Sequence, residues 1–285
     1  MRLLANTFNP EYVVIGHITQ DVAADGFTPG GTALYAGLTA QALGLNVGIL
    51  SAHRSDFELP ILPNLQILTK DSAQTTRFKN INSLEGRVQY LYEKATDLTL
   101  SDVPAHWRGA HILHLGPVAC EVDPLILKSF PDSLICMTPQ GWMRDWGEDC
   151  RVHFKPWERA AEILPQTDVA CMSLEDVQND ESIIEFMAAH IKVMVVTEAQ
   201  RGARVYWNGD MHRFGAPQRR EVDVTGAGDI FAASFFIRYY KTRNPWEAAR
   251  FANQMASASI ERQGLASIPD SREITIFQTE IIEEK

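Results

Sequence analysis

The sequence predicts an α/β protein with a mostly parallel sheet. Its 285 residues, 45% of them hydrophobic and 22% charged, are enough for one large domain with a full core. The short β-branched runs at 12–18 and 193–197 are typical of strands buried in a parallel sheet. Residues 33–44 form a predicted helix of small residues that ends on a glycine cap. We therefore expect residues 1–285 to form a single α/β domain.

Composition also limits the classes of partner. The net charge of −10 and the pI near 5.3 argue against nucleic acid and anionic membranes, because both require a basic face. Four cysteines without a Cys-x-x-Cys pair are typical of buried thiols in a reducing compartment. No charged-then-apolar leader opens the chain, and no apolar run approaches the ~20 residues of a membrane helix. We expect a cytoplasmic protein that binds neither nucleic acid nor membrane.

An anion site is predicted where residues 223–229, Asp-Val-Thr-Gly-Ala-Gly-Asp, precede the apolar run 230–237. Small residues before a run too apolar for a surface loop indicate a turn that leads into a buried helix. The first amides of a helix are unpaired and partly positive, so they can bind a phosphate. The amides expected to do so belong to Gly226, Ala227 and Gly228.

Asp229 is the unusual residue of this segment. A carboxylate beside an anion site repels the anion unless it takes part in the chemistry. The helix terminus favours its ionised form, which can accept the proton of an attacking hydroxyl. The alternative is an ordinary glycine loop with Asp229 as a capping acid, because short glycine patterns recur by chance.

The complete motif is more specific than its glycines. Residues 223–229 resemble the signature of the PfkB carbohydrate kinases, the ribokinase-like family, with Val224 where threonine is usual. The resemblance is colinear from Asp21 to the predicted helix that begins at Pro245. It implies a three-layer α/β/α ribokinase-like fold with a mostly parallel central sheet and a small β lid.

The resemblance also implies an activity, the ATP-dependent phosphorylation of a hydroxyl on a small sugar or polyol, with Mg²⁺. Asp229 would be the general base and residues 226–228 the anion hole. Gly-Arg-Val-Gln at 86–89 and Pro-Gln-Gly at 139–141 are similar to the inositol-kinase-like branch. The alternatives are a kinase of a nucleoside or vitamin precursor on the same fold, and a non-catalytic binder of nucleotide or polyol.

The lid is predicted from segments that alternate polar and apolar residues, as in a half-exposed hairpin at about 75–93. In the resemblance this hairpin covers the substrate, and Arg77 is a candidate to contact it. Residues 21–30 are expected to be too short for the further pair of lid strands found in larger members, so the lid should be reduced. An exposed lid edge permits either a monomer or a homodimer.

Other substrate residues come from the same resemblance. Asp21 follows the first strand, where open α/β sheets bind ligands, and it would bind substrate hydroxyls; by pattern alone it is a turn residue. Gly30 and Gly31 match the glycine pair that the family places beside its sugar. Gln140 and Arg144 follow the predicted strand at 134–137 and are further candidates to contact the substrate; the equal alternative is that both are ordinary polar residues on the surface.

The nucleotide and metal residues of the family match this chain in part. Ala199 replaces the first glycine of the nucleotide pattern, and Ser173 and Asp176 replace the family's Asn-x-x-Glu, which organises magnesium. Acids in a first helical turn also suffice as a purely structural feature. The expected metal ligand is Asp176, and the residues expected to line the nucleotide site are Thr197, Gly202, Thr225, Gly226, Gly228 and Asn253.

Overall fold

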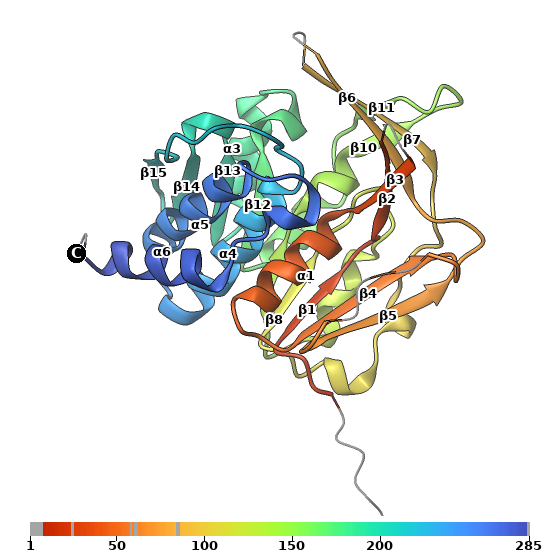
Figure 1. Cartoon of the computed structure of the whole chain (residues 1–285), viewed down its shortest axis with the longest axis horizontal. Coiled ribbons are helices and arrows are strands. Elements are labelled where there is room, and N and C mark those ends of the chain that lie inside the picture. Colours follow the sequence, from red (N-terminus) through yellow and green to blue (C-terminus); the bar gives the residue numbers. More distant parts are fainter. Residues whose placement is uncertain (1–7, 24–25, 58, 60–61, 84–85, 284–285) are drawn as a thin grey trace, which may run out of the picture.

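The computed structural model describes residues 8–23, 26–57, 59, 62–83 and 86–283. A nine-stranded sheet forms the centre of the molecule, in the order β15-β14-β13-β12-β9-β8-β1-β4-β5 (Figure 1). Its strands are β1 (Tyr12–Ile15), β4 (Val47–His53), β5 (Leu65–Asp71), β8 (Ile112–Leu115), β9 (Leu134–Met137), β12 (Val169–Ser173), β13 (Val193–Thr197), β14 (Ala203–Trp207) and β15 (Asp210–Phe214).

The sheet is mostly parallel, as predicted. The strands from β13 to β5 pair in parallel along the whole order, whereas β14 pairs antiparallel with both β13 and β15. Parallel neighbours end at the same edge of a sheet, so the loops that follow β1, β8, β9, β12 and β13 converge there. The candidate residues of the active site lie on these loops, on the lid, on the loop between β15 and α4, and on the helices beside them.

Helices cover both faces of the sheet. The main helices are α1 (Thr32–Ala42), α2 (Ala160–Ile163), α3 (Glu181–Ala189), α4 (Ala227–Thr242), α5 (Pro245–Ser259) and α6 (Ser271–Glu283). Side chains alternate along β1, so Tyr12 and Val14 join the core beneath α1, α4 and α5, while Val13 and Ile15 join the core beneath α3 and several short 3₁₀ helices. The three-layer α/β/α arrangement is therefore confirmed (Figure 1).

A second sheet of four strands projects from the carboxyl edge of the first (Figure 1). Its order is β3-β2-β6-β7, formed by β2 (Thr19–Ala23), β3 (Gly26–Gly30), β6 (Arg77–Ser83) and β7 (Gly86–Glu93). The expectation that residues 21–30 are too short for two lid strands is wrong. β2 and β3, with five residues each, form a complete antiparallel pair, because a hairpin needs few residues between its strands.

The β6–β7 hairpin also contacts a small ribbon that the sequence did not reveal. Strands β10 (Arg144–Trp146) and β11 (Val152–Phe154) pair with each other, and the Leu91 amide donates to the Cys150 carbonyl at 2.8 Å. These strands have only three residues each, which is too few for a readable alternation of polar and apolar residues. None of the helices in the described part of the chain is long and apolar enough to span a membrane.

A buried histidine lies under the carboxyl edge of the sheet and makes stability depend on pH. His114 pairs with the Tyr12 hydroxyl at 2.7 Å and the Thr138 hydroxyl at 3.0 Å, and burial lowers its pKa to about 3. Below pH 6.5 an unfolded imidazole binds a proton that this folded one rejects. We expect the free energy of unfolding to fall by about 1.4 kcal/mol per pH unit from this group between pH 6.5 and 3.

Urea unfolding at pH 7, 6 and 5 measures the slope, and NMR titration of the His114 ring assigns it. A ring that gains its proton near pH 6.5 in the folded protein contradicts the expectation.

Candidate active site

The glycine-rich segment ends in a left-handed residue that begins α4. Gly226 is the N-cap, with φ of 79°. A Cβ at this position would overlap the ring of Tyr35, which is buried against the start of the helix. Gly226 is therefore required both for its backbone conformation and for the close approach of α1.

Asp223 fixes the loop that precedes the cap. Its carboxylate accepts hydrogen bonds from the Thr225 amide at 2.9 Å and from the Gly264 amide at 3.1 Å. Burial alone would raise the pKa of Asp223, but these hydrogen bonds outweigh burial and lower it. The first carboxylate of the motif thus ties the cradle to the loop after α5.

The space at the N-terminus of α4 fits a phosphate group. A Cβ added to Gly228 would have no heavy atom within 4 Å, and Gly228 itself is exposed. α4 has 16 residues, and its exposed N-terminus combines oriented amides with the positive end of the helix dipole. The Ala227 amide already donates to the Val224 carbonyl at 3.2 Å, so the second glycine of the motif is better placed for an anion than Ala227.

Asp229 is the end of a chain of hydrogen bonds that crosses the site. The Thr32 hydroxyl donates to Asp229 Oδ1 at 2.7 Å, and Gln140 Nε2 donates to that hydroxyl at 3.0 Å. Arg144 Nη2 donates to Gln140 Oε1 at 2.9 Å. The structure thus brings Gln140 and Arg144 together with Asp229 through Thr32, a residue that sequence reasoning did not select.

Asp21, on β2 of the lid, lies on the same side of the molecule as Asp229. It accepts a hydrogen bond from the Thr19 hydroxyl at 3.1 Å. A Cβ on Gly30 would come within 2.6 Å of its Oδ2, so the glycine makes room for this carboxylate. Burial raises the pKa of Tyr35, and the nearby charges of Asp223, Asp229 and Asp21 raise it further. The phenol of Tyr35 therefore lies near carboxylates of both the lid and the cradle.

Gly31 forms the joint between the lid and α1. It is the N-cap of that helix, with φ of 90°, and a Cβ would come within 2.5 Å of the His17 carbonyl oxygen. Only glycine adopts this conformation without strain at so close an approach.

Arg77 does not join the site. Strand pairing places Asp21 beside Phe78, so Arg77 lies on the opposite face of the lid. There it forms an ion pair with Glu93 and lies 5.3 Å from the Phe27 ring centroid. The alternation of Arg77 with buried Phe78 was the signal that could have excluded it.

The lid face that carries Asp21 has other polar groups. Asn80 shares the face of Phe78 by alternation, and Gln89 pairs with Asn80 in the strand register. Gln89 Nε2 donates to Asn80 Oδ1 at 2.7 Å. Sequence reasoning did not select Asn80, which lies on this face. Of the segment 86–89, the side chains of residues 86 and 87 lie outside the described part of the structure.

The expected nucleotide residues brace one loop. Asn253 is 4% exposed, and its Nδ2 donates to the Phe214 carbonyl at 3.1 Å. Gly202 has φ of 90°, and a Cβ there would overlap the same carbonyl oxygen. Thr197 ends β13, where its hydroxyl donates to the Met172 carbonyl at 3.4 Å. Gly202 and Asn253 thus position the chain after β15, which leads into the cradle.

The expected metal residues form a helix cap. The Ser173 amide donates to Asp176 Oδ2 at 2.8 Å, and the Ser173 hydroxyl accepts from the Glu175 amide at 3.2 Å. Burial, and then the charges of Asp176 and Asp229, raise the pKa of the Cys171 thiol, so both carboxylates lie near the end of β12. Across the described ranges, no three His, Cys, Asp or Glu side chains form a metal cluster.

Asp176 and Asp229 near one strand end suit Mg²⁺, which usually binds through one or two carboxylates, several waters and the phosphates of the substrate.

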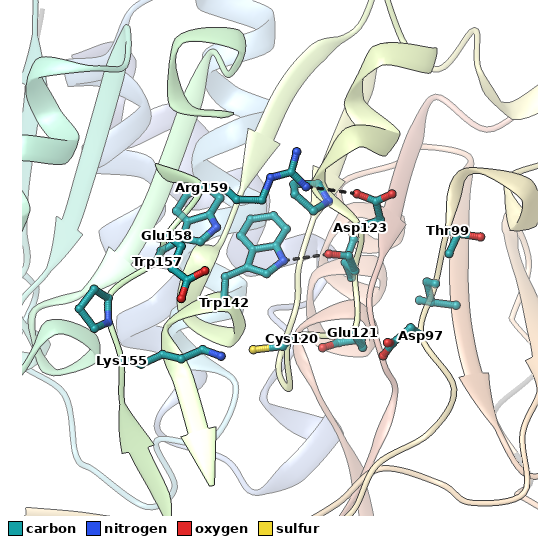
Figure 2. A pocket seen from close by; sticks show the side chains of 14 residues that line it. Asp97, Thr99, Cys120, Glu121, Asp123, Trp142, Lys155, Trp157, Glu158 and Arg159 are labelled. Carbon is teal, nitrogen blue, oxygen red and sulfur yellow. Dashed lines mark hydrogen bonds and ion pairs between the residues drawn. The ribbon is translucent and has the colours of Figure 1, made fainter. Parts of the chain in front are cut away.

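A cavity of about 360 Å³ lies next to the segment that carries Gln140 and Arg144 (Figure 2). The rings of Trp142 and Trp157 stack on its wall, with their centroids 4.7 Å apart. Cys120 Sγ donates to the Gly141 carbonyl at 2.9 Å and fixes the same segment. Neither Asp229 nor the cradle lines this cavity.

Taken together, a parallel sheet, a β lid and a glycine cradle at the carboxyl edge define the ribokinase-like fold. Residues 155–272 match the model of the pfkB family carbohydrate kinases, so the predicted resemblance to that family is confirmed. Relatives of this chain are named as fructokinase, ribokinase and inositol kinase. The prediction of an enzyme of the carbohydrate kinase class is therefore confirmed as well.

Three relatives illustrate the range of substrates in the names of similar kinases. A nucleoside kinase from Methanothermobacter thermautotrophicus is 25% identical over 86% of this chain and 82% of its own length. A fructokinase from Escherichia coli is 26% identical over 50% of this chain and 51% of its own. An inositol 3-kinase from Oryza sativa is 33% identical over 25% of this chain and 18% of its own. The match thus spans most of the nucleoside kinase, about half of the fructokinase and less than a fifth of the inositol 3-kinase.

Solved structures confirm the fold over nearly the whole chain. A pyrophosphate-dependent kinase of the ribokinase family, complexed with a pyrophosphate analogue and myo-inositol, has a TM-score of 0.75 at 19% identity, over 93% of this chain and 99% of that one. Arabidopsis thaliana ribokinase, complexed with ribose and ATP, has a TM-score of 0.69 at 17% identity, over 94% and 98%.

Proposed function

We propose that this protein transfers the γ-phosphoryl group of ATP to a hydroxyl of a small sugar or polyol, with residues 1–285 acting as one kinase domain. The observation that carries the proposal is the position of Asp229. Its carboxylate is at the first turn of α4, directly after the cradle, and is held from the side by Thr32. A protein that only binds nucleotide gains nothing from a carboxylate that repels phosphate.

The proposed reaction is an in-line transfer. The substrate oxygen forms a bond to the γ-phosphorus, while the bond from that phosphorus to the bridging oxygen breaks and ADP leaves. Asp229 accepts the proton of the hydroxyl, and the amides of residues 226–228 stabilise the charge on the transferred group. Thr197, Gly202, Thr225 and Asn253 line or brace the nucleotide side.

The acceptor site would lie between the cradle and the lid. Asp21 and the Asn80–Gln89 pair offer carboxylate and amide groups, which suit several neighbouring hydroxyls. The inositol 3-kinase and fructokinase relatives support a polyol or sugar, and the nucleoside kinase supports the alternative acceptor, a nucleoside. Gln140 contacts both Thr32 and Arg144, so the contribution of Gln140 and Arg144 to substrate binding is proposed to be indirect.

A screen of phosphoryl transfer tests the function. ATP consumption is measured with Mg²⁺ over inositols, hexoses, pentoses and nucleosides, with Asp229→Asn as the matched control. Turnover with one class identifies the acceptor and distinguishes an enzyme from a binder. Pyrophosphate replaces ATP in a second arm, because a pyrophosphate-dependent kinase is among the similar structures. Transfer from pyrophosphate alone would correct the donor and keep the chemistry of Asp229.

The metal proposal predicts a separable effect at Asp176. Asparagine can still accept the Ser173 amide, so Asp176→Asn should keep the helix cap and the melting temperature. Loss of the negative charge should raise the Mg²⁺ concentration needed for half-maximal turnover, because water-mediated carboxylates hold this ion. Coincident Mg²⁺ titrations for variant and parent would exclude Asp176 as a metal residue.

The compartment and the assembly stay predictions. Among the described residues, all four cysteines are free thiols, which supports the expectation of a reducing cytoplasm. A monomer and a homodimer both remain compatible with β3, an outer strand of the lid.

A further inference from the structure

The hydrogen-bonded chain from Arg144 to Asp229 has a role of its own. We propose that Thr32, held by Gln140 and Arg144, is a positioning residue that orients the Asp229 carboxylate for proton abstraction. The proposal rests on the proposed function of Asp229 and deepens it. It also gives Gln140 and Arg144 a different role from direct substrate binding.

The chemistry at its two ends fixes the direction of every bond in the chain. Arginine is only a donor, so Arg144 must contact the carbonyl oxygen of Gln140. The amide nitrogen of Gln140 then faces Thr32 and donates to its hydroxyl oxygen. With that lone pair used, the hydroxyl proton points to the carboxylate of Asp229, which is an acceptor. With Asp229 ionised, as a general base must be, this is the only arrangement of protons that satisfies all three contacts.

The rotamer of Thr32 is fixed as well. The residue is 1% exposed at the first turn of α1. A Cβ on Gly116 would come within 2.7 Å of the Thr32 methyl group, so the absence of a side chain at Gly116 provides the space for that methyl. With the methyl held there, the hydroxyl is directed at Asp229. Threonine in a helix is restricted to two main χ1 rotamers, and the space at Gly116 favours the one that places the methyl there.

The far end of the chain is anchored to two parts of the fold. Arg144 Nη1 donates to the Val118 carbonyl at 2.8 Å, in the loop after β8. Its guanidinium lies 5.7 Å from the ring centroid of Phe78, which is on the inner face of the lid. The orientation of Asp229 therefore depends on contacts with both the sheet edge and the lid.

The expected consequence is a change in turnover rather than in binding. A carboxylate with one oxygen held by Thr32 keeps its plane, and the proton transfer needs that geometry in the transition state. Loss of the contact should therefore lower kcat and leave the KM for ATP nearly unchanged. A residue that only stabilises the fold would change the melting temperature without this kinetic pattern.

The test compares Thr32→Val, which removes the hydroxyl at constant shape, with Thr32→Ser, which keeps it. We expect Thr32→Val to lower kcat by about 10-fold to 100-fold, in the range of a misplaced catalytic group. Thr32→Ser should keep kcat within about threefold, because its hydroxyl can make the same bonds. The matched control is Thr39→Val, a buried threonine of the same helix that donates to the Tyr35 carbonyl at 2.7 Å.

A second variant shows whether the chain acts as a unit. Gln140→Leu should lower kcat in the same direction, and the Thr32→Val/Gln140→Leu pair should be no slower than Thr32→Val alone, because coupled residues are not additive. Assays run below the lowest melting temperature exclude unfolding. Equal kcat for Thr32→Val and Thr39→Val, or independent additive effects, would overturn the proposal. If Asp229→Asn is inactive while Thr32→Val is active, only this inference fails; an active Asp229→Asn sinks the proposed function itself.

Discussion

Asp229→Asn should reduce turnover by ~10²–10⁴-fold, the usual cost of losing a general base. Asparagine keeps the size of the side chain and can accept the Thr32 hydroxyl, but it cannot accept a proton at neutral pH. Affinity for ATP should hold or rise, because a negative charge beside the phosphates is removed. Turnover, ATP affinity and melting temperature are measured on this one variant.

The capping interpretation makes the opposite forecast for the same variant. A capping asparagine is about as good as a capping aspartate, so activity and stability would both remain close to the parent. More than about a tenth of parental turnover would remove Asp229 from the mechanism, because the smallest usual effect of losing a base is larger.

Gly226→Ala should have the second largest effect. The alanine Cβ would enter the space of the Tyr35 ring, in a backbone conformation with φ of 79°. Either the first turn of α4 or α1 must then shift, which moves the cradle amides away from the phosphoryl group. Loss of one such donor costs about 10²–10³-fold in kcat, and we expect a loss of this order.

The control for Gly226→Ala is Gly44→Ala. Gly44 also has positive φ, 86°, but an added Cβ would meet no heavy atom within 4 Å. Alanine at this position would have the backbone strain of a positive φ, about 1 kcal/mol, without displacing a neighbour. Melting temperatures of the two variants separate strain from overlap. Full turnover in Gly226→Ala would show that the cradle does not act on the transferred group.

The parts of the fold that sequence predicted share a local cause. The runs at 12–18 and 193–197 became β1 and β13, and the run at 230–237 became the buried face of α4. Each is a continuous apolar run, and such a run predicts a buried element without knowledge of its tertiary contacts. The two lid strands at 19–30 were missed because a five-residue hairpin depends on pairing with β6 rather than on its own pattern.

The site divides in the same way. Sequence could propose Asp229 and the glycines as candidates, because a motif of seven adjacent residues is local. Arg77 was wrongly grouped with the substrate residues, since the face of the lid that meets the body is set by where Phe78 is buried. Residue-by-residue comparison with a family also cannot show that Gln140 contacts Thr32 rather than an open surface.

By itself, the sequence determined the resemblance to the family, the parallel sheet and the turn that begins α4, because hydrophobic runs and adjacent motif residues are written along the chain. Only the tertiary structure decided that Thr32 contacts Asp229, that Gly202 and Asn253 meet at one carbonyl, and that Asp176 caps a helix. Thr32 and Asp229 are 197 positions apart. Packing of α1 against α4 creates that contact, and no local pattern of residues records it.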